Sequence, residues 1–211
     1  MQNLINLIEQ DHLGWYRENP SLKSLTTYRC SGNAKLLIFP KDTKSLKIIL
    51  KYLKDNNINY KLFGNGSNIL ASDKDYDGVI IKLTKICGID KDGTTIAVDA
   101  GYSLSLLANQ ISKEGLSGLE FACGIPGTVG GAVYMNAGAY LSDISNVLEK
   151  IDILDENLEE KTILNKDLDF GYRHSILSER NWIVLKAYFN LKKGNKEEII
   201  ELINERKMRR V

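Results

Sequence analysis

The sequence predicts a globular protein that mixes strands and helices but departs from the Rossmann order. Apolar runs with strand character and stretches of helical apolar spacing occur along the whole chain. A glycine-rich loop, Gly64–Asn68, follows the second strand of the opening rather than the first, and it lacks the third glycine of G-x-G-x-x-G. The residues after this loop predict a turn and another strand, whereas a Rossmann unit would continue with a helix.

The first half of the chain predicts helix, strand, helix and strand in that order. Residues 1–19 predict an amphipathic helix followed by a polar connector. Lys35–Phe39 predicts a strand that ends at Pro40, and Asp42 or Thr43 is suited to cap the helix that follows. Ile58–Phe63 predicts the next strand. The apolar stripes of the two helices consist of Leu4, Ile5, Leu7 and Ile8 and of Leu46, Ile49, Leu50 and Leu53.

The second half predicts a helix between groups of strands and a helix at the end. Ser103 is suited to cap a helix that ends at Gly115. Asn195-x-x-Glu198 fits a relaxed capping box at the start of the last helix. The predicted strands are Val79–Leu83, Thr95–Ala100, Ile151–Leu154, Glu160–Leu164 and Trp182–Leu191.

The composition is that of a soluble globular protein. The 211 residues are 43% hydrophobic and 26% charged, which is ordinary for such a protein. The net charge of +1 gives no electrostatic case for nucleic acid or an anionic membrane. The cations Arg206, Lys207, Arg209 and Arg210 suit a helix end or a solvated face. No run of 18 apolar residues predicts a membrane span, and the N-terminus lacks the basic region of a signal peptide.

The cysteines and histidines predict neither disulfides nor a metal site. Cys30, Cys87 and Cys123 are odd in number and far apart, which favours reduced thiols in a cytosolic protein. Cys123 adjoins a glycine-rich stretch, where a buried apolar role is favoured over a functional thiol. His12 and His174 are the only histidines, so no histidine-based metal site is expected.

Two glycine-rich stretches suggest a dinucleotide cofactor. The first, Gly64, Asn65, Gly66, Ser67 and Asn68, combines glycine backbone freedom with neutral donors, as pyrophosphate binding requires. The second contains Gly124, Ile125, Pro126, Gly127, Gly130, Gly131 and Ala132, and its glycines and alanine would let a flat ring lie against the backbone. Taken singly, each stretch favours a set of tight turns required by packing. Together they favour a nucleotide.

A third motif, Asp169–Ser175, contains the pair Tyr172 and Arg173 after Gly171. A guanidinium binds a carboxylate or phosphate through two parallel hydrogen bonds. A surface arginine is the alternative reading. His174 and Ser175 are sequence neighbours without a nucleophile elbow, so we set nucleophilic catalysis aside.

Five motifs in a fixed order resemble those of the UDP-N-acetylenolpyruvoylglucosamine reductase family, FAD enzymes of bacterial peptidoglycan synthesis. They are Thr26–Arg29, Gly64–Asn68, Gly118–Ala132, Asn136–Tyr140 and Phe170–Arg173, within about residues 26 to 191. Their order and spacing make the resemblance specific.

The resemblance implies an α+β FAD-binding fold of the vanillyl-alcohol-oxidase type in two lobes, residues 1–83 and 84–211. It implies non-covalent FAD, with Gly64–Asn68 on the pyrophosphate and Gly124–Ala132 along the flavin. NADPH would reduce the flavin, and the enolpyruvyl group of a UDP-sugar would then be reduced and protonated. Arg173 would stabilise the negative charge that develops on this substrate, with Tyr172 beside it. The implied location is the cytoplasm, and the implied process is cell-wall synthesis.

The chain departs from the family pattern because it contains no match to the family's substrate-binding domain. The serine that donates the proton, in G-S-x-F-x-N-P, has no counterpart in these 211 residues. We therefore expect impaired turnover by this chain alone, or a second chain that supplies the domain. The alternative is a flavin-binding module with another acceptor, or a non-enzymatic interaction protein.

Overall fold

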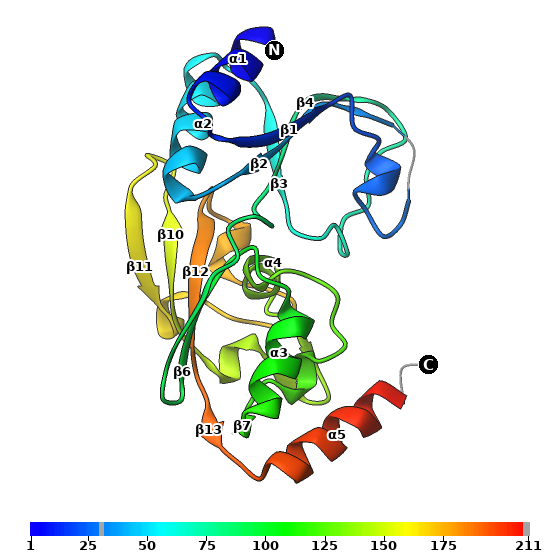
Figure 1. Ribbon diagram of the computed structural model, residues 1–211, viewed down its shortest axis with the longest axis vertical. Helices are drawn as coiled ribbons and strands as arrows, with labels where there is room; N and C mark the ends of the chain where they lie inside the picture. Colours follow the sequence, from blue (N-terminus) through cyan, green and yellow to red (C-terminus); the bar gives the residue numbers. More distant parts are fainter. Residues whose placement is uncertain (30–31, 209–211) are drawn as a thin grey trace. The chain divides into compact units, whose positions relative to one another are not determined.

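The computed structural model describes residues 1–29 and 32–208, so Cys30, Arg209 and Arg210 lie outside the described residues (Figure 1). The chain divides into two compact units, Met1–Ile86 and Cys87–Val211, and each is described by itself. In the described part of the chain, none of the helices combines the length and the apolar character needed to cross a bilayer.

The first unit is a four-stranded sheet with two helices. Its strands are β1 (Gly14–Glu18), β2 (Ala34–Pro40), β3 (Tyr60–Phe63) and β4 (Tyr76–Lys82). Their order is β1-β2-β4-β3; β4 runs parallel to both β2 and β3, and β1 runs antiparallel to β2. The helices are α1 (Gln2–Gln10) and α2 (Thr43–Asp55). This sheet positions the first glycine-rich loop at the carboxyl end of β3.

The helices of this unit form for the reasons that the sequence predicts. Asp42 caps α2, because its carboxylate accepts the backbone N–H of Ser45 at 2.7 Å. The residues of the two predicted apolar stripes are buried, with the exception of half-buried Leu7. The polar connector expected before residue 19 is wrong, since Gly14–Glu18 forms β1 at the edge of the sheet. Charged side chains are common on edge strands, where they oppose pairing of the free edge with another chain.

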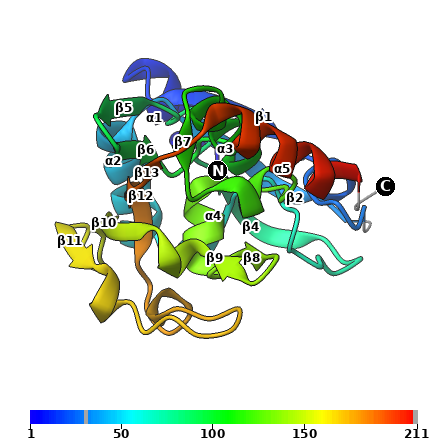
Figure 2. The same cartoon turned by 90° about the horizontal axis from the view of Figure 1, so that it is seen from below.

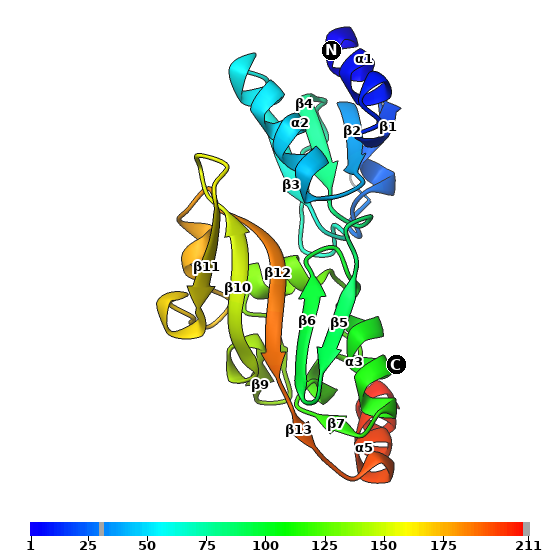
Figure 3. The same ribbon diagram turned by 60° about the vertical axis from the view of Figure 1, so that its left-hand side comes forward.

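The second unit is a five-stranded antiparallel sheet that Figure 3 shows face on. Its strands are β5 (Ile89–Asp92), β6 (Thr95–Asp99), β10 (Leu148–Leu154), β11 (Glu160–Leu164) and β12 (Ile183–Asn190). Their order is β11-β10-β12-β6-β5. Two short pairs supplement this sheet: β7 (Leu116–Ser117) with β13 (Lys192–Lys193), and β8 (Gly138–Ala139) with β9 (Ser142–Asp143).

Three helices lie on one side of this sheet, α3 (Leu104–Lys113), α4 (Val129–Tyr134) and α5 (Lys196–Met208) (Figure 2). Alternate residues of β6, Ile96 and Val98, are fully buried, which is the pattern of a strand with one covered face. Helix α4 packs on β12 and β6. Ser103 caps α3 by accepting the N–H of Leu106, as expected. This packing fixes the second glycine-rich stretch, which leads into α4.

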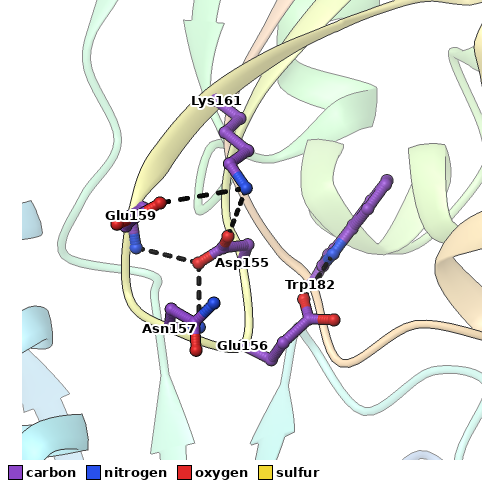
Figure 4. Close-up of polar contacts among 6 residues, drawn as sticks. All are labelled: Asp155, Glu156, Asn157, Glu159, Lys161 and Trp182. Carbon is purple, nitrogen blue, oxygen red and sulfur yellow. Dashed lines mark hydrogen bonds and ion pairs between the residues drawn. The ribbon is translucent and has the colours of Figure 1, made fainter.

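The turn between β10 and β11 is closed by a buried carboxylate (Figure 4). Asp155 accepts the backbone N–H groups of Asn157 at 2.8 Å and Glu159 at 2.9 Å, and it pairs with Lys161 Nζ at 2.6 Å. The hydrogen bond from Lys161 is the main cause that lowers the pKa of Asp155 below its ordinary value. Nearby, Trp182 Nε1 donates to Glu156 at 2.7 Å. Because these groups satisfy one another, the cluster is structural.

Candidate functional site

The first glycine-rich loop packs against the backbone of the segment that precedes β2. Gly66 is buried and has a φ of +72°, a conformation that favours glycine. A Cβ built on Gly66 would lie 2.0 Å from the carbonyl oxygen of Leu25, and Gly66 O accepts the N–H of Thr27 at 3.1 Å. Glycine is therefore required here by contact with the protein's own chain.

The outer part of the same loop presents polar groups to solvent. Asn65 and Asn68 are exposed, whereas Gly64 and Ser67 are half-buried. Within residues 1–29 and 32–208, neither Asn65 nor Asn68 has a hydrogen bond to another protein group. Their amides and backbone N–H groups can therefore donate to an anion without losing a protein partner.

The Thr26–Arg29 motif packs against this loop, and Thr27 donates its backbone N–H to Gly66 O. Leu25 and Phe63, which flank the contact, belong to one apolar cluster, and the buried hydroxyl of Thr26 donates to Leu22 O. The buried members of the cluster are Leu22, Leu25, Ala34, Leu37, Phe63 and Ile80. Two motifs about 40 residues apart in the sequence are thus in direct backbone contact, through Gly66 with Leu25 and Thr27.

The second glycine-rich stretch leads into α4, and the protein itself occupies the N–H groups at the start of this helix. Val129 N donates to Tyr102 O and Gly130 N to Ala100 O, each at 2.9 Å. Thr128, the N-cap, accepts the N–H of Gly131 at 3.3 Å. The N–H groups at these three positions are therefore satisfied by the protein, unlike those of a helix start that binds phosphate.

Small side chains in this stretch serve two different purposes. A Cβ on Gly130 would lie 2.8 Å from the Cβ of Ala100, so Gly130 lets α4 approach the end of β6. Gly131 is exposed, and a Cβ there would meet only Thr128 Oγ1, at 3.4 Å. Pro126 is exposed, while Gly124, Ile125 and Gly127 are half-buried and Ala132 is buried. The open backbone of the stretch therefore lies at Gly131 and at residues 124–127.

Tyr172 and Arg173 occupy the tip of a tight turn in the second unit. Gly171 and His174 exchange backbone hydrogen bonds at 3.1 and 3.3 Å, which closes the turn. Arg173 has a φ of +55°, at the turn position where glycine or asparagine is usual. Its guanidinium lies 5.6 Å from the Tyr172 ring centroid, and Tyr172 is 93% exposed.

Two of the sequence motifs meet at this turn. Arg173 Nη2 donates to Gly138 O at 3.0 Å, and Asn136 Nδ2 donates to Gly171 O at 3.0 Å. The structure therefore joins the Asn136–Tyr140 and Phe170–Arg173 motifs, which are separated by 35 positions in the sequence. Asn136 was not expected as a site residue. From the sequence it had no role of its own, and it was included only as part of the Asn136–Tyr140 motif of the family resemblance.

The groups set aside on sequence grounds lie in structural roles. Ser175 is fully buried, and its hydroxyl donates to Tyr134 O at 2.7 Å. His174 faces Glu179 and Asp169, at 3.5 and 3.9 Å from its Nε2. Cys123 is buried and Cys87 is exposed. Among the described residues no group of three or more histidine, cysteine, aspartate or glutamate side chains could hold a metal ion.

Comparisons with known proteins show the family to which this chain is similar. Residues 34–159 match the FAD binding domain family. The UDP-N-acetylenolpyruvoylglucosamine reductase of Caldicellulosiruptor bescii is 45% identical over 195 residues, which cover 92% of this chain and 62% of the relative. That of Bacillus pumilus is 44% identical over 209 residues, covering 98% of this chain and 69% of the relative. The chain thus spans somewhat less than two thirds of some relatives.

Solved structures support the same fold. The UDP-N-acetylenolpyruvylglucosamine reductase of Thermus caldophilus matches with a TM-score of 0.79 and 33% identity, over 93% of this chain and 70% of the other. The glucose dehydrogenase Phl p 4.0202 matches with a TM-score of 0.62 at 15% identity, over 82% of this chain and 39% of the other, which indicates a shared fold alone. The expected α+β FAD-binding fold of the vanillyl-alcohol-oxidase type is confirmed. The chain belongs to the UDP-N-acetylenolpyruvoylglucosamine reductase family of FAD-dependent oxidoreductases.

Proposed function

We propose that this chain binds one FAD without a covalent link and serves the reduction of UDP-N-acetylglucosamine enolpyruvate to UDP-N-acetylmuramate. The observation that carries the proposal is the turn at Arg173, where a strained, exposed arginine is held by a second motif of the same family. Backbone strain at an exposed polar residue persists where the surrounding structure enforces it, and such residues cluster at functional sites.

The proposed contacts with FAD are assigned to each unit by itself. Residues 1–83 supply Gly64–Asn68 for the pyrophosphate, where exposed Asn65 and Asn68 offer donors. Residues 84–211 supply Gly124–Gly127, Gly130, Gly131 and Ala132 along the flavin, where small or backbone-exposing residues leave room for a ring system. The occupied N–H groups of α4 favour contact with an uncharged ring over contact with a phosphate.

Arg173 and Tyr172 are the proposed substrate contacts. FAD, when bound, supplies the two-electron chemistry that links NADPH to the enolpyruvyl double bond. Negative charge then develops on the carboxylate side of the substrate, and the exposed guanidinium of Arg173 stabilises it by charge-assisted hydrogen bonds. The bond from Nη2 to Gly138 O uses one donor of the five, so the remaining face of the guanidinium can still bind a carboxylate.

The same reaction requires a proton at the α-carbon. The 211 residues contain no G-S-x-F-x-N-P motif, so the family's serine donor has no counterpart among them. We therefore expect the chain by itself to turn over the substrate about 10² to 10⁴ times more slowly than a reductase that has this donor, because general acid catalysis is lost. A second chain that carries this motif would restore the rate. The proposed setting is the cytoplasm, in peptidoglycan synthesis and hence in the maintenance of cell shape and division.

The test is stopped-flow absorbance of the purified chain loaded with FAD. NADPH should bleach the flavin, and oxygen should restore the colour faster than UDP-N-acetylglucosamine enolpyruvate does. Denaturation should release the flavin. A colourless protein that cannot be reconstituted with FAD would refute the cofactor proposal. Reoxidation by the substrate on the order of 10 per second would show a proton donor within this chain.

A further inference from the structure

The turn that carries Arg173 lacks the local support that its conformation needs. It consists of two residues between Gly171 and His174, and two backbone hydrogen bonds between this pair close it. A left-handed backbone at a non-glycine residue costs about 1–2 kcal/mol. The side chains at its tip are exposed, so packing does not offset this cost. A contact from elsewhere in the unit must therefore hold the turn.

The segment from Tyr134 to Gly138 provides this contact at three alternate positions. Tyr134 O accepts the hydroxyl of Ser175, Asn136 Nδ2 donates to Gly171 O, and Gly138 O accepts Nη2 of Arg173. The distances are 2.7, 3.0 and 3.0 Å. Alternate residues of one segment thus form hydrogen bonds with Gly171 at the start of the turn, Arg173 at its tip and Ser175 just after it.

Asn136 is the one member of this segment whose side chain makes the contact. It is only 4% exposed and has a φ of +41°, which asparagine tolerates better than most residues. Its Oδ1 accepts the backbone N–H of Ser145 at 3.0 Å. Because a backbone N–H can only donate, this bond fixes the amide orientation and directs Nδ2 at Gly171 O.

We infer that Asn136 is a positioning residue for Arg173: its amide holds the Gly171 carbonyl and thereby keeps the guanidinium beside Gly138. The inference deepens the proposed function and rests on it for the identity of the substrate. It assigns Asn136 no contact with substrate or cofactor. Asparagine is required because the site needs one acceptor, one donor and a left-handed backbone in a single residue.

The test measures the freedom of the Arg173 guanidinium by nuclear magnetic resonance. In the unaltered chain the two Nη groups of Arg173 should give separate signals, since one of them is hydrogen bonded. Arg173→Lys assigns these signals by removing them. Asn136→Asp keeps the acceptor for Ser145 but sets a carboxylate oxygen against Gly171 O, so the Nη signals should merge. If Asn136→Asp does not fold, Asn136→Gly replaces it, because glycine tolerates the positive φ at this position. The Nη signals should merge in this variant too.

Asn165→Asp is the matched control. Asn165 also donates through Nδ2 to backbone carbonyls, those of Ser145 and Leu148, but it does not contact the turn. It should lower thermal stability without merging the Arg173 signals. Unchanged Arg173 signals in both Asn136 variants, or merged signals in the control, would overturn the inference.

A second measurement separates the inference from the proposed function. Calorimetric titration with UDP-N-acetylglucosamine enolpyruvate should give an affinity about tenfold to a hundredfold lower in both Arg173→Ala and Asn136→Asp. The double variant should lose no more than Arg173→Ala does, because the two residues act as one unit. If Arg173→Ala binds this substrate normally, the proposed role of Arg173 fails, while the resonance experiment still decides whether Asn136 positions it.

Discussion

The two glycine-rich loops look alike in sequence, but they use their glycines differently. In Gly64–Asn68, the buried glycine meets the backbone of Leu25, and the neighbouring asparagines are exposed. In the stretch before α4, the helix N–H groups bond to Ala100, Tyr102 and Thr128. The first loop therefore leaves polar donors exposed, whereas the N–H groups at the start of α4 are hydrogen bonded within the protein.

The difference indicates that a glycine in a glycine-rich stretch can be required by the protein's own packing. Gly66 and Gly130 are both required by the protein's own packing, against Leu25 O and Ala100 Cβ respectively. Gly131, by contrast, has space around it. Substitutions at these positions should therefore separate effects on folding from effects on FAD binding.

Gly66→Ala should produce the largest effect. Its Cβ would clash with a backbone carbonyl and would stand on a left-handed residue, so we expect destabilisation by about 2–5 kcal/mol and loss of FAD. Gly93→Ala is the matched control, because Gly93 has a φ of +60° but no atom within 4 Å of its Cβ. It should cost about 1–2 kcal/mol through strain alone. Urea unfolding of the two variants decides; equal losses would contradict the role of the Leu25 contact.

Gly130→Ala and Gly131→Ala should differ in which property they change. Gly130→Ala forces α4 away from Ala100 and should destabilise the protein by about 1–3 kcal/mol. Gly131→Ala adds a methyl group to an exposed helical position and should raise stability by about 0.5–1 kcal/mol. Flavin fluorescence should nevertheless show weaker FAD binding by Gly131→Ala. Normal FAD affinity in this variant would remove Gly131 from the proposed flavin surface.

Much of the fold follows from the sequence, because its larger elements have a regular apolar pattern. The stripe from Leu46 to Leu53 and the cap at Asp42 predict α2, and the structure agrees. The two-residue strands, such as β8 and β9, were not predictable, since no periodicity exists over two residues. Strand β1 was missed because Trp15, Arg17 and Glu18 are exposed, so its sequence resembles a polar connector.

The candidate site was predicted by motif and not by geometry. The sequence marks Gly64–Asn68 and Arg173 as suited to anions, since their chemistry is local. It does not show that Gly66 faces Leu25, or that Asn136 reaches Gly171, because these contacts join segments that are 35 or more positions apart. The expected reason for Gly66, backbone freedom for pyrophosphate binding, is therefore incomplete, because the structure adds a packing requirement.

Arg173 has a left-handed backbone without being a glycine, so it extends the comparison of the glycine positions. Arg173→Gly relieves the strained backbone but loses the bond to Gly138 O, so its stability should be close to that of the unaltered chain. Arg173→Ala loses the same bond and keeps the strain, so it should be less stable than Arg173→Gly by about 1 kcal/mol. Thermal unfolding of the pair measures this difference. Equal stabilities would mean that the turn relaxes, and Arg173 would then not be held under strain.

The smallest effect concerns a polar network that the protein satisfies by itself, on the sheet of the second unit. Tyr188 donates to Asp152 at 2.7 Å, and this bond, followed by burial, raises the pKa of Tyr188 to about 12. Thr162 donates to the same carboxylate at 2.6 Å. As at the start of α4, the polar groups here are bonded to the protein itself. We therefore expect this network to affect how the free energy of unfolding depends on pH, and not to affect ligand binding.

Asp152→Asn tests this directly. A folded pKa above the unfolded value of about 10 means that Tyr188 stabilises the fold fully below that pH, and that this contribution is lost as pH rises toward the folded value. The substitution should lower the pKa of Tyr188 toward about 10 and leave FAD binding at neutral pH unchanged. Alkaline titration of tyrosinate absorbance, with Tyr188→Phe to identify the contribution of this side chain, gives the shift. Coincident titration curves would show that burial rather than Asp152 controls Tyr188. A change in FAD affinity would show instead that the sheet is coupled to the site, because the network itself leaves no donor for a ligand.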